Sequence, residues 1–176
     1  MLKNTYTAYG SVAKVFHWLI FLLVLCMIIV GFFMDDVSDK ALRGQVYSIH
    51  KLTGLSILFL MLLRLLWTLI NPKPATLFGT PFWQRAAERL VHFLLYAVLI
   101  AMPIAGWVGS VAAGYVPHLF GFYFNLPIQK SESVNHLAFE IHEILAYTIM
   151  VLVSIHVLAA LYHYFFKKDE ILQRMF

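Results

Sequence analysis

The sequence predicts an all-α fold: an integral membrane bundle of four helices with both termini in the cytoplasm. Hydrophobic residues make up 61% of the 176 residues and charged residues only 12%, which is too little polar surface to cover a soluble domain of this size. The mean hydropathy is +0.79. Four apolar stretches are each long enough to cross about 30 Å of hydrocarbon. We therefore expect a single domain, residues 1–176, that lies in a lipid bilayer.

The predicted spans cover residues of about 15–34, 49–70, 90–110 and 140–166. The first follows a basic residue as a signal peptide would, but it is too long for one and no small-residue cleavage site follows, so we expect it to be retained. Pro72 and Pro74 end the second span, because proline lacks the amide proton that continues a helix. Pro103 is expected to bend the third. The fourth follows the longest polar connector, whose aromatic residues suit a membrane interface.

Basic residues predict the orientation of the bundle. If both termini lie on one side, nine lysines and arginines flank the spans on that side and four on the other. Such residues are enriched in cytoplasmic loops, so we expect both termini in the cytoplasm. The pI near 9.2 reflects this asymmetry, and because the sequence has no arginine-rich motif we expect no nucleic-acid partner.

Four of the histidines inside the predicted spans fall at matched depths, and an ionisable side chain there is costly and by default marks a functional site. The antiparallel order of the spans places His17 and His156 at cytoplasmic depth, and His50 and His142 at external depth. On the fourth span, the fourteen residues from 142 to 156 are nearly four turns, about 21 Å along one face. The sequence therefore predicts two histidine pairs, one near each membrane surface.

Two imidazoles that face each other from neighbouring helices are what a six-coordinate haem iron requires, because the flat porphyrin lies between its axial ligands. Zinc favours tetrahedral clusters of three or four ligands, which the sequence does not supply. We therefore predict haem iron at His17–His156 and at His50–His142. Arg64, fourteen residues after His50 on the same stripe, is predicted to pair with a haem propionate, the alternative being a side chain that reaches the headgroups. The alternative is that these histidines bind no iron and are simply hydrogen-bonded within the bundle.

A set of short motifs runs along nearly the whole chain. They are Tyr9-Gly10, Phe16-His17-Trp18, Ile49-His50-Lys51 with Thr53-Gly54, Pro72-Lys73-Pro74, His92 with Tyr96, Pro103 with Gly106, Glu140-Ile141-His142-Glu143, Ile155-His156 and Lys168-Asp169 with Arg174-Met175. Together they resemble the bacterial cytochrome b561 family. The resemblance implies a multi-pass protein of the bacterial inner membrane that holds two haem b groups and passes electrons from external superoxide to ubiquinone. Related b-type subunits of hydrogenases and formate dehydrogenases share the architecture but serve large partner complexes.

Histidine on both sides of each iron would leave no open position, so the expected chemistry is outer-sphere electron transfer. At the external end, Lys51 beside His50 is the predicted catalytic residue, because a cation there would attract the superoxide anion. Six acidic and four basic residues share that surface, a net formal charge of −2, which weakens this interpretation. Ordinary solvated charge is the alternative role for Lys51.

At the cytoplasmic end, His163 lies seven residues after His156 and is the predicted catalytic donor of hydrogen bonds and protons to the quinone. His92, Trp18 and Lys14 are further candidates for the quinone site. The alternative for His163 is a side chain that faces lipid headgroups. No obligatory protein partner is expected. Two other functions remain open from the sequence: an electron-transfer subunit that links quinone to a dehydrogenase or hydrogenase, and a membrane scaffold without a cofactor.

Overall fold

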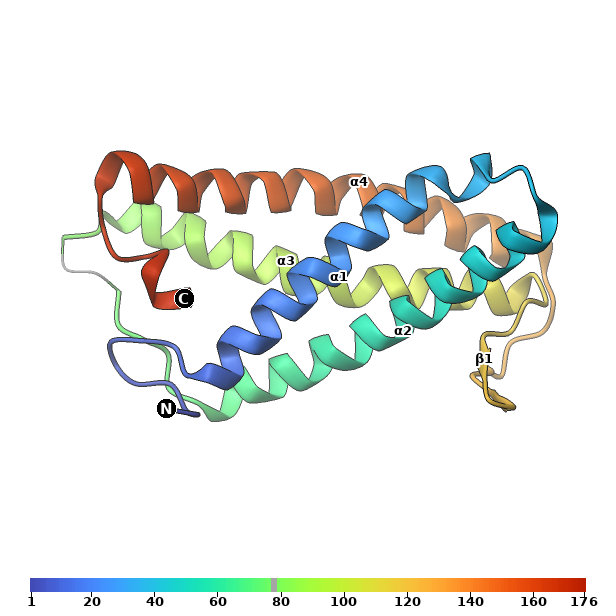
Figure 1. Ribbon diagram of the computed structural model, residues 1–176, viewed down its shortest axis with the longest axis horizontal. Coiled ribbons are helices and arrows are strands. Elements are labelled where there is room, and N and C mark those ends of the chain that lie inside the picture. The colour runs from blue at the N-terminus through green and yellow to red at the C-terminus, as the bar shows by residue number, and fades with distance from the viewer. Residues whose placement is uncertain (77–78) are drawn as a thin grey trace.

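In the computed structural model, which describes residues 1–76 and 79–176, four long helices run up and down in one bundle (Figure 1). They are α1 (Ser11–Phe33), α2 (Lys40–Ile70), α3 (Phe82–Ala112) and α4 (Glu132–Tyr162). Each is long and apolar enough to cross a membrane. The predicted all-α membrane bundle of four helices is confirmed.

All four helices begin before the predicted spans, because polar residues extend them beyond the apolar stretches. α2 begins nine residues early and α4 eight residues early, relative to the predicted starts at 49 and 140. Side chains cap both starts: Asp39 accepts a hydrogen bond from the amide of Leu42 at 2.7 Å, and Ser131 accepts one from Val134 at 3.4 Å. Caps of this kind stabilise a helix by about 1 kcal/mol. Hydropathy finds the membrane-spanning part of each helix, whereas the caps set its true beginning.

Short elements join and follow the helices. A 3₁₀ turn, η1 (Met34–Asp36), follows α1, and a π-helical turn, η2 (His163–Lys167), continues α4 before a last 3₁₀ turn, η3 (Gln173–Met175). Between α3 and α4, strands β1 (His118–Leu119) and β2 (Phe122–Tyr123) form an antiparallel hairpin. Its turn places Phe120 and Gly121 at φ of 48° and 85°. The hairpin rings are exposed, as an interfacial flap requires.

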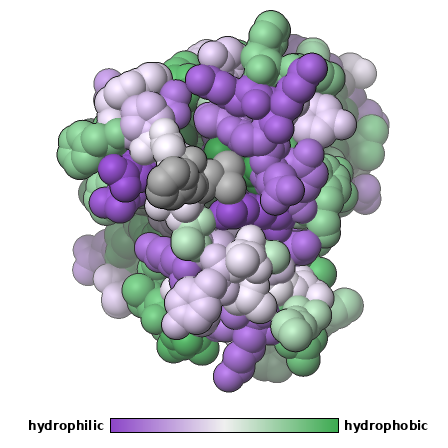
Figure 2. Space-filling view, turned by 90° about the vertical axis from the view of Figure 1, so that its left-hand side faces the viewer, coloured by the Kyte–Doolittle hydropathy of each residue, from purple (hydrophilic) through white to green (hydrophobic). Residues whose placement is uncertain are grey.

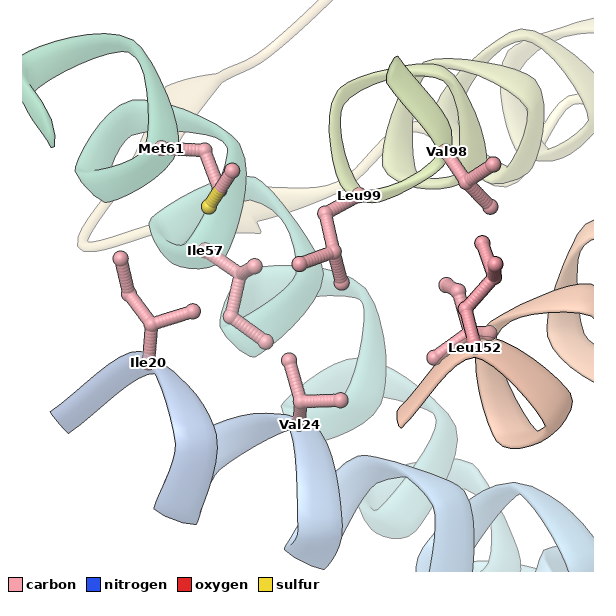
Figure 3. Packing of buried hydrophobic residues seen from close by; sticks show 8 residues of the cluster. Ile20, Val24, Ile57, Met61, Val98, Leu99 and Leu152 are labelled. Carbon is pink, nitrogen blue, oxygen red and sulfur yellow. The ribbon is translucent and has the colours of Figure 1, made fainter. Parts of the chain in front are cut away.

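The apolar core lies where all four helices meet, midway along the bundle. Figure 3 shows side chains of this cluster pointing toward one another from every helix. Its buried members are Ile20 and Val24 of α1, Ile57 and Met61 of α2, Val98 and Leu99 of α3, and Ile149 and Leu152 of α4. Most other apolar side chains of the helices are exposed on the outside of the bundle, where lipid would cover them.

Close backbone contacts join consecutive helices: α1 with α2, α2 with α3, and above all α3 with α4. The backbones of α1 and α4, and those of α2 and α4, approach each other closely at few places or none. The bundle is therefore tightly packed between consecutive helices and more open between α4 and the first two helices.

Both termini lie at one end of the bundle, which we call the terminal end, and η1 and the hairpin lie at the other, the hairpin end (Figure 1). Three segments meet at the terminal end: Asn4 donates to the Pro72 carbonyl at 3.0 Å, and Arg174 donates to the Ala75 carbonyl at 2.6 Å. Gly10 allows this packing, because a Cβ there would collide with the backbone of Leu2 and Lys3. Figure 2, an end-on view of this face, shows hydrophilic residues gathered at its centre and apolar ones around its rim.

Candidate functional site

Four histidines of the membrane-spanning helices form two pairs, one toward each end of the bundle. At the terminal end, the ring centroids of His17 on α1 and His156 on α4 are 6.1 Å apart. At the hairpin end, those of His50 on α2 and His142 on α4 are 6.4 Å apart. The structure thus brings together the couples that depth matching predicted. Each couple joins α4 to a helix with which it has little backbone contact, so there is room between the rings.

A cavity opens beside each pair. The cavity at the hairpin end has a volume of about 160 Å³ and is lined by His50, His142, Lys51 and mostly apolar side chains. The cavity at the terminal end is smaller, about 60 Å³. Cofactor pockets are typically mostly apolar, with a few placed polar groups. Val24 and Leu99 line both cavities, so a thin apolar layer of the core separates them.

His142 is held by a hydrogen bond to the backbone of α3. Its Nδ1 lies 3.0 Å from the carbonyl oxygen of Met102. A carbonyl can only accept, so Nδ1 carries the proton and Nε2 keeps its lone pair. Gly106 makes room for the ring, since a Cβ there would lie 2.9 Å from Nδ1. This is the arrangement that orients a histidine for binding a metal through Nε2.

His50 lies opposite, with its Nδ1 buried and without a hydrogen-bond partner among the described residues. A buried polar atom without a partner is unfavourable by about 1–3 kcal/mol. Gly31 on α1 faces this ring, because a Cβ there would lie 3.6 Å from Cε1 of His50. A ligand that binds this nitrogen would offset its unfavourable burial.

Arg64 reaches the cavity at the terminal end, as its spacing from His50 predicted. Its Nη2 lies 3.0 Å from Nδ1 of His17, and its guanidinium lies 5.5 Å from the centre of the Tyr96 ring. The Tyr96 hydroxyl is 3.1 Å from the hydroxyl of Thr68. Arginine only donates, so His17 accepts through Nδ1 in this arrangement. The guanidinium is a positive charge inside the bundle, directed at this cavity rather than at the headgroups.

His92 also lines the terminal-end cavity. Its ring centroid lies 5.2 Å from that of His156, with the two planes at 83°. Its Nδ1 lies 2.8 Å from the carbonyl oxygen of Glu88, one turn earlier on α3. Nearby, Tyr9 packs against this end of the bundle, where burial and the Glu88 carboxylate raise the pKa of its hydroxyl. Tyr9 is therefore protonated at neutral pH.

Lys51 lies at the rim of the hairpin-end cavity. Its Nζ is 3.5 Å from the carbonyl oxygen of Tyr115 and 5.3 Å from the centre of that ring. Lys130 packs on the adjacent residue, Gly114, where a Cβ would collide with the lysine side chain. Two of the four basic residues expected on this side therefore converge on one turn next to the cavity.

The remaining candidates for the quinone site meet the folded-back segment that follows α4. The Trp18 indole donates to the Met175 carbonyl at 2.8 Å, and Lys14 Nζ donates to the Phe176 carbonyl at 2.7 Å. The Nδ1 of His163 lies 2.5 Å from the Asp169 carboxylate. None of these three lines either cavity, whereas His92 does. All three contact the segment that follows α4, through Asp169, Met175 and Phe176.

Sequence reasoning did not identify the Met102 carbonyl, Tyr96 as a neighbour of Arg64, or Asp169 as the partner of His163. Tyr96 carries a sequence signal, because it lies one turn after His92 on the same helical face. The Met102 carbonyl carries none, because it depends on how deeply the His142 ring reaches into α3. Among the described residues, no group of three or more histidine, cysteine, aspartate and glutamate side chains is placed to hold a metal ion.

The chain is similar to known proteins along nearly its whole length. Residues 8–176 match the family model for prokaryotic cytochrome b561. The chain is 32% identical to cytochrome b561 homolog 2 of Escherichia coli over 98% of its own length and 93% of that protein, and 28% identical to homolog 1 over 90% and 91%. It is 29% identical to a Yersinia pestis protein named "probable superoxide oxidase CybB" over 90% of each chain.

Proposed function

The chain belongs to the prokaryotic cytochrome b561 family, and from this premise we propose that it holds two b-type haems and oxidises superoxide at one membrane face while it reduces ubiquinone at the other. Members of the family bind b-type haem and transfer electrons across membranes, and the four spans make the protein a multi-pass membrane protein. The proposal extends these properties to the number of haems, the substrates and the bacterial inner membrane, with residues 1–176 as one functional domain and the terminal end in the cytoplasm.

The separation of the paired rings is the observation that carries the proposal. Bonds between a metal and a histidine nitrogen are about 2 Å long, so an iron between two imidazoles would hold their ring centroids about 6 Å apart. The measured separations are 6.1 Å for His17–His156 and 6.4 Å for His50–His142. The unpartnered Nδ1 of His50 and the space that Gly106 leaves for His142 also fit such a group.

His17 and Arg64 fit a haem at the terminal end through their hydrogen-bonding roles. A neutral histidine that binds iron through Nε2 carries its proton on Nδ1 and therefore accepts nothing there. Arg64 would then release His17 and pair with an anion, and a haem propionate is an anion of suitable geometry for a guanidinium. Tyr96 would keep Arg64 in the cavity, because the ring already lies against the guanidinium.

If each histidine pair holds the iron of a b-type haem, that group would supply one-electron transfer and leave no place on the metal for a substrate. Residues of this chain would then have to position both substrates. In the overall reaction, two superoxide anions are each oxidised to dioxygen by loss of one electron, and one quinone takes up the two electrons with two protons to give quinol.

Lys51 is the proposed residue for superoxide. It lines the cavity of His50 and His142, and its ammonium group lies at the rim beside Tyr115. Lys130 adds a second cation on the same turn. The excess of acidic residues on this side argues against general attraction of anions, so the attraction would be local. Two cations at one rim support this interpretation.

For the quinone we propose Lys14, Trp18 and His163, which all contact the segment that follows α4. The first two are hydrogen-bond donors that now engage carbonyl oxygens of residues 175 and 176, and quinone oxygens are acceptors of the same kind. His163, paired with the Asp169 carboxylate, is a suitable donor of protons from the cytoplasmic side. His92 lies deeper, against His156, and is assigned another role below.

A haem assay and a superoxide pulse test the proposal. Purified protein should contain two haems per chain by the pyridine haemochrome method. Pulsed superoxide should reduce them and, with ubiquinone present, yield quinol in half the amount of superoxide consumed. Absence of haem would refute the whole proposal. Two haems that ignore superoxide, together with a co-purifying dehydrogenase or hydrogenase, would support the electron-transfer subunit instead.

A further inference from the structure

Three histidines, not two, meet at the terminal-end cavity. His17, His92 and His156 all line it, and the ring of His92 lies closer to His156 than His17 does, at 5.2 Å against 6.1 Å. We propose that His92 is a positioning residue that accepts a hydrogen bond from Nδ1 of His156 when that histidine binds iron. The inference rests on the proposed function in one respect, the assignment of His156 as an axial ligand.

The hydrogen bond to Glu88 fixes which nitrogen of His92 can accept. Its Nδ1 lies 2.8 Å from the Glu88 carbonyl oxygen, which has no proton to give. Nδ1 of His92 therefore carries the proton, and Nε2 of the neutral ring has the free lone pair. α3 thus presents a histidine in a defined tautomer, with an acceptor nitrogen, in the cavity where His156 lies.

His156 needs such an acceptor. A histidine bound to a metal through Nε2 usually donates its other ring N–H to an oxygen or nitrogen that fixes its orientation. For His142 that acceptor is the Met102 carbonyl, 3.0 Å away. Among the described residues, no hydrogen bond is formed to the ring of His156. The orientation of this ring therefore depends on a group that comes within hydrogen-bonding distance of it.

The other polar groups that line the cavity are poorer candidates for the acceptor of the His156 hydrogen bond. Arg64 only donates. The ring of Tyr96 lies against Arg64 and its hydroxyl lies 3.1 Å from Thr68, whereas the rings found in contact with His156 are those of His17 and His92. The remaining lining residues besides the histidines are apolar: Ile20, Phe21, Val24, Met61, Leu95, Leu99 and Val153. His92 is therefore the acceptor that the cavity offers to His156.

When His156 donates this hydrogen bond to His92, its ring becomes a more basic ligand. A more basic ligand stabilises ferric iron and lowers the reduction potential of its haem. In this protein the two haems would differ in this respect, since a backbone carbonyl serves His142 and an imidazole serves His156. A side chain can be replaced and a carbonyl cannot, so the proposed role of His92 can be tested directly.

The test compares His92→Leu, which removes the acceptor, with His92→Gln, whose amide oxygen retains one. His136→Leu is the matched control, because His136 is an exposed histidine at the start of α4 that lines neither cavity. Redox titration and electron paramagnetic resonance of the purified haem-loaded protein are the measurements. In His92→Leu, one haem should rise in potential and change its low-spin ferric signal while the other stays as in the wild type. His92→Gln should restore most of the shift, and His136→Leu should change neither haem.

Three results would overturn the inference. Both potentials could stay unchanged in His92→Leu, both could shift together, or both His92 variants could lose a haem, which would make His92 a ligand or a structural residue. If His92→Leu alone loses a haem while His92→Gln retains two at wild-type potentials, the acceptor role stands. These outcomes are distinct from failure of the proposed function, which would be seen in the wild-type protein as the lack of two haems.

Discussion

Gly106 on α3 lies directly against the ring of His142 on α4: a Cβ at position 106 would stand 2.9 Å from both Cε1 and Nδ1 of that ring. Real Cβ contacts are longer, so a side chain here must displace the histidine. The same nitrogen is hydrogen-bonded to Met102 on α3, so the ring has little freedom to move away. The closeness of these two helices thus depends on the absence of one methyl group.

Gly106→Ala should therefore disturb one haem and leave the other intact. We expect weaker binding or a changed spectrum of the haem at the hairpin end, with a loss of about 1–3 kcal/mol in the free energy of unfolding from overpacking. Haem content and the low-spin ferric signal are the measurements. Gly44→Ala is the control, since nothing lies within 4 Å of a Cβ there. An unperturbed Gly106→Ala protein would show that the ring has room to shift.

The pairing of the histidines predicts how single substitutions combine. His17→Ala and His156→Ala should each remove or alter the same haem, and His50→Ala and His142→Ala the other, because each pair is proposed to share one iron. Haem content should fall from two toward about one per chain in each variant. His118→Ala serves as control, because that ring is exposed and stacks on Tyr123. If His17→Ala and His142→Ala removed the same haem, the pairing would be wrong.

Replacing Arg64 should change the reduction potential of the haem at the terminal end. A cation near the iron favours the reduced form, which carries less positive charge, so Arg64→Gln should lower that potential. Arg64→Lys retains the charge and should restore most of it, though without the planar pair of donors. Redox titration of both haems measures this. An equal effect of both variants would indicate that the guanidinium acts through its shape and hydrogen bonds rather than its charge.

Lys51→Gln should slow the reduction of the haems by superoxide by about tenfold and weaken its dependence on ionic strength, because local attraction of the anion is lost. Pulse radiolysis at several salt concentrations provides the rate. Lys40→Gln removes an exposed lysine of the same side and should leave the rate nearly unchanged, since Lys40 does not line the cavity. Equal slowing in both variants would point to the overall charge of this surface.

At the quinone end, His163→Gln should slow the formation of quinol while both haem spectra stay as in the wild type. The imidazole paired with Asp169 would no longer supply protons, whereas neither cavity is altered. Steady-state quinol formation at fixed superoxide measures this, with His136→Gln as control. Loss of a haem in His163→Gln would show that the residue supports the haem site instead.

Several features were predictable from the sequence because they depend on helix geometry alone. The depths of the four histidines follow from span order, and the direction of Arg64 follows from its spacing to His50, since both residues lie on one regular helix, α2. The seven-residue spacing from His156 to His163 did not predict the partner of His163. The α-helical geometry of α4 ends at Tyr162, and the π-helical turn and the segment after it bring Asp169 against the imidazole.

Other features could not be derived because they depend on tertiary packing. The contact between His142 and Met102 depends on how deeply the His142 ring enters the facing helix, α3. The bonds from Lys14 and Trp18 to residues 175 and 176 require a chain that turns back after Lys168, which adopts a φ of 53°. Neither this turn nor the depth of the His142 ring in α3 has a periodic signature in the sequence.

The pairing of the first helix with the last also has a consequence for biogenesis. The ribosome makes His17 long before His156, so the two enter the bilayer at different times. Both histidines could bind the proposed iron at this level only after the fourth span has been synthesised. Insertion of the polypeptide should thus precede completion of the cofactor, and a nascent chain stalled after the third span should lack the ligands supplied by α4 at both levels.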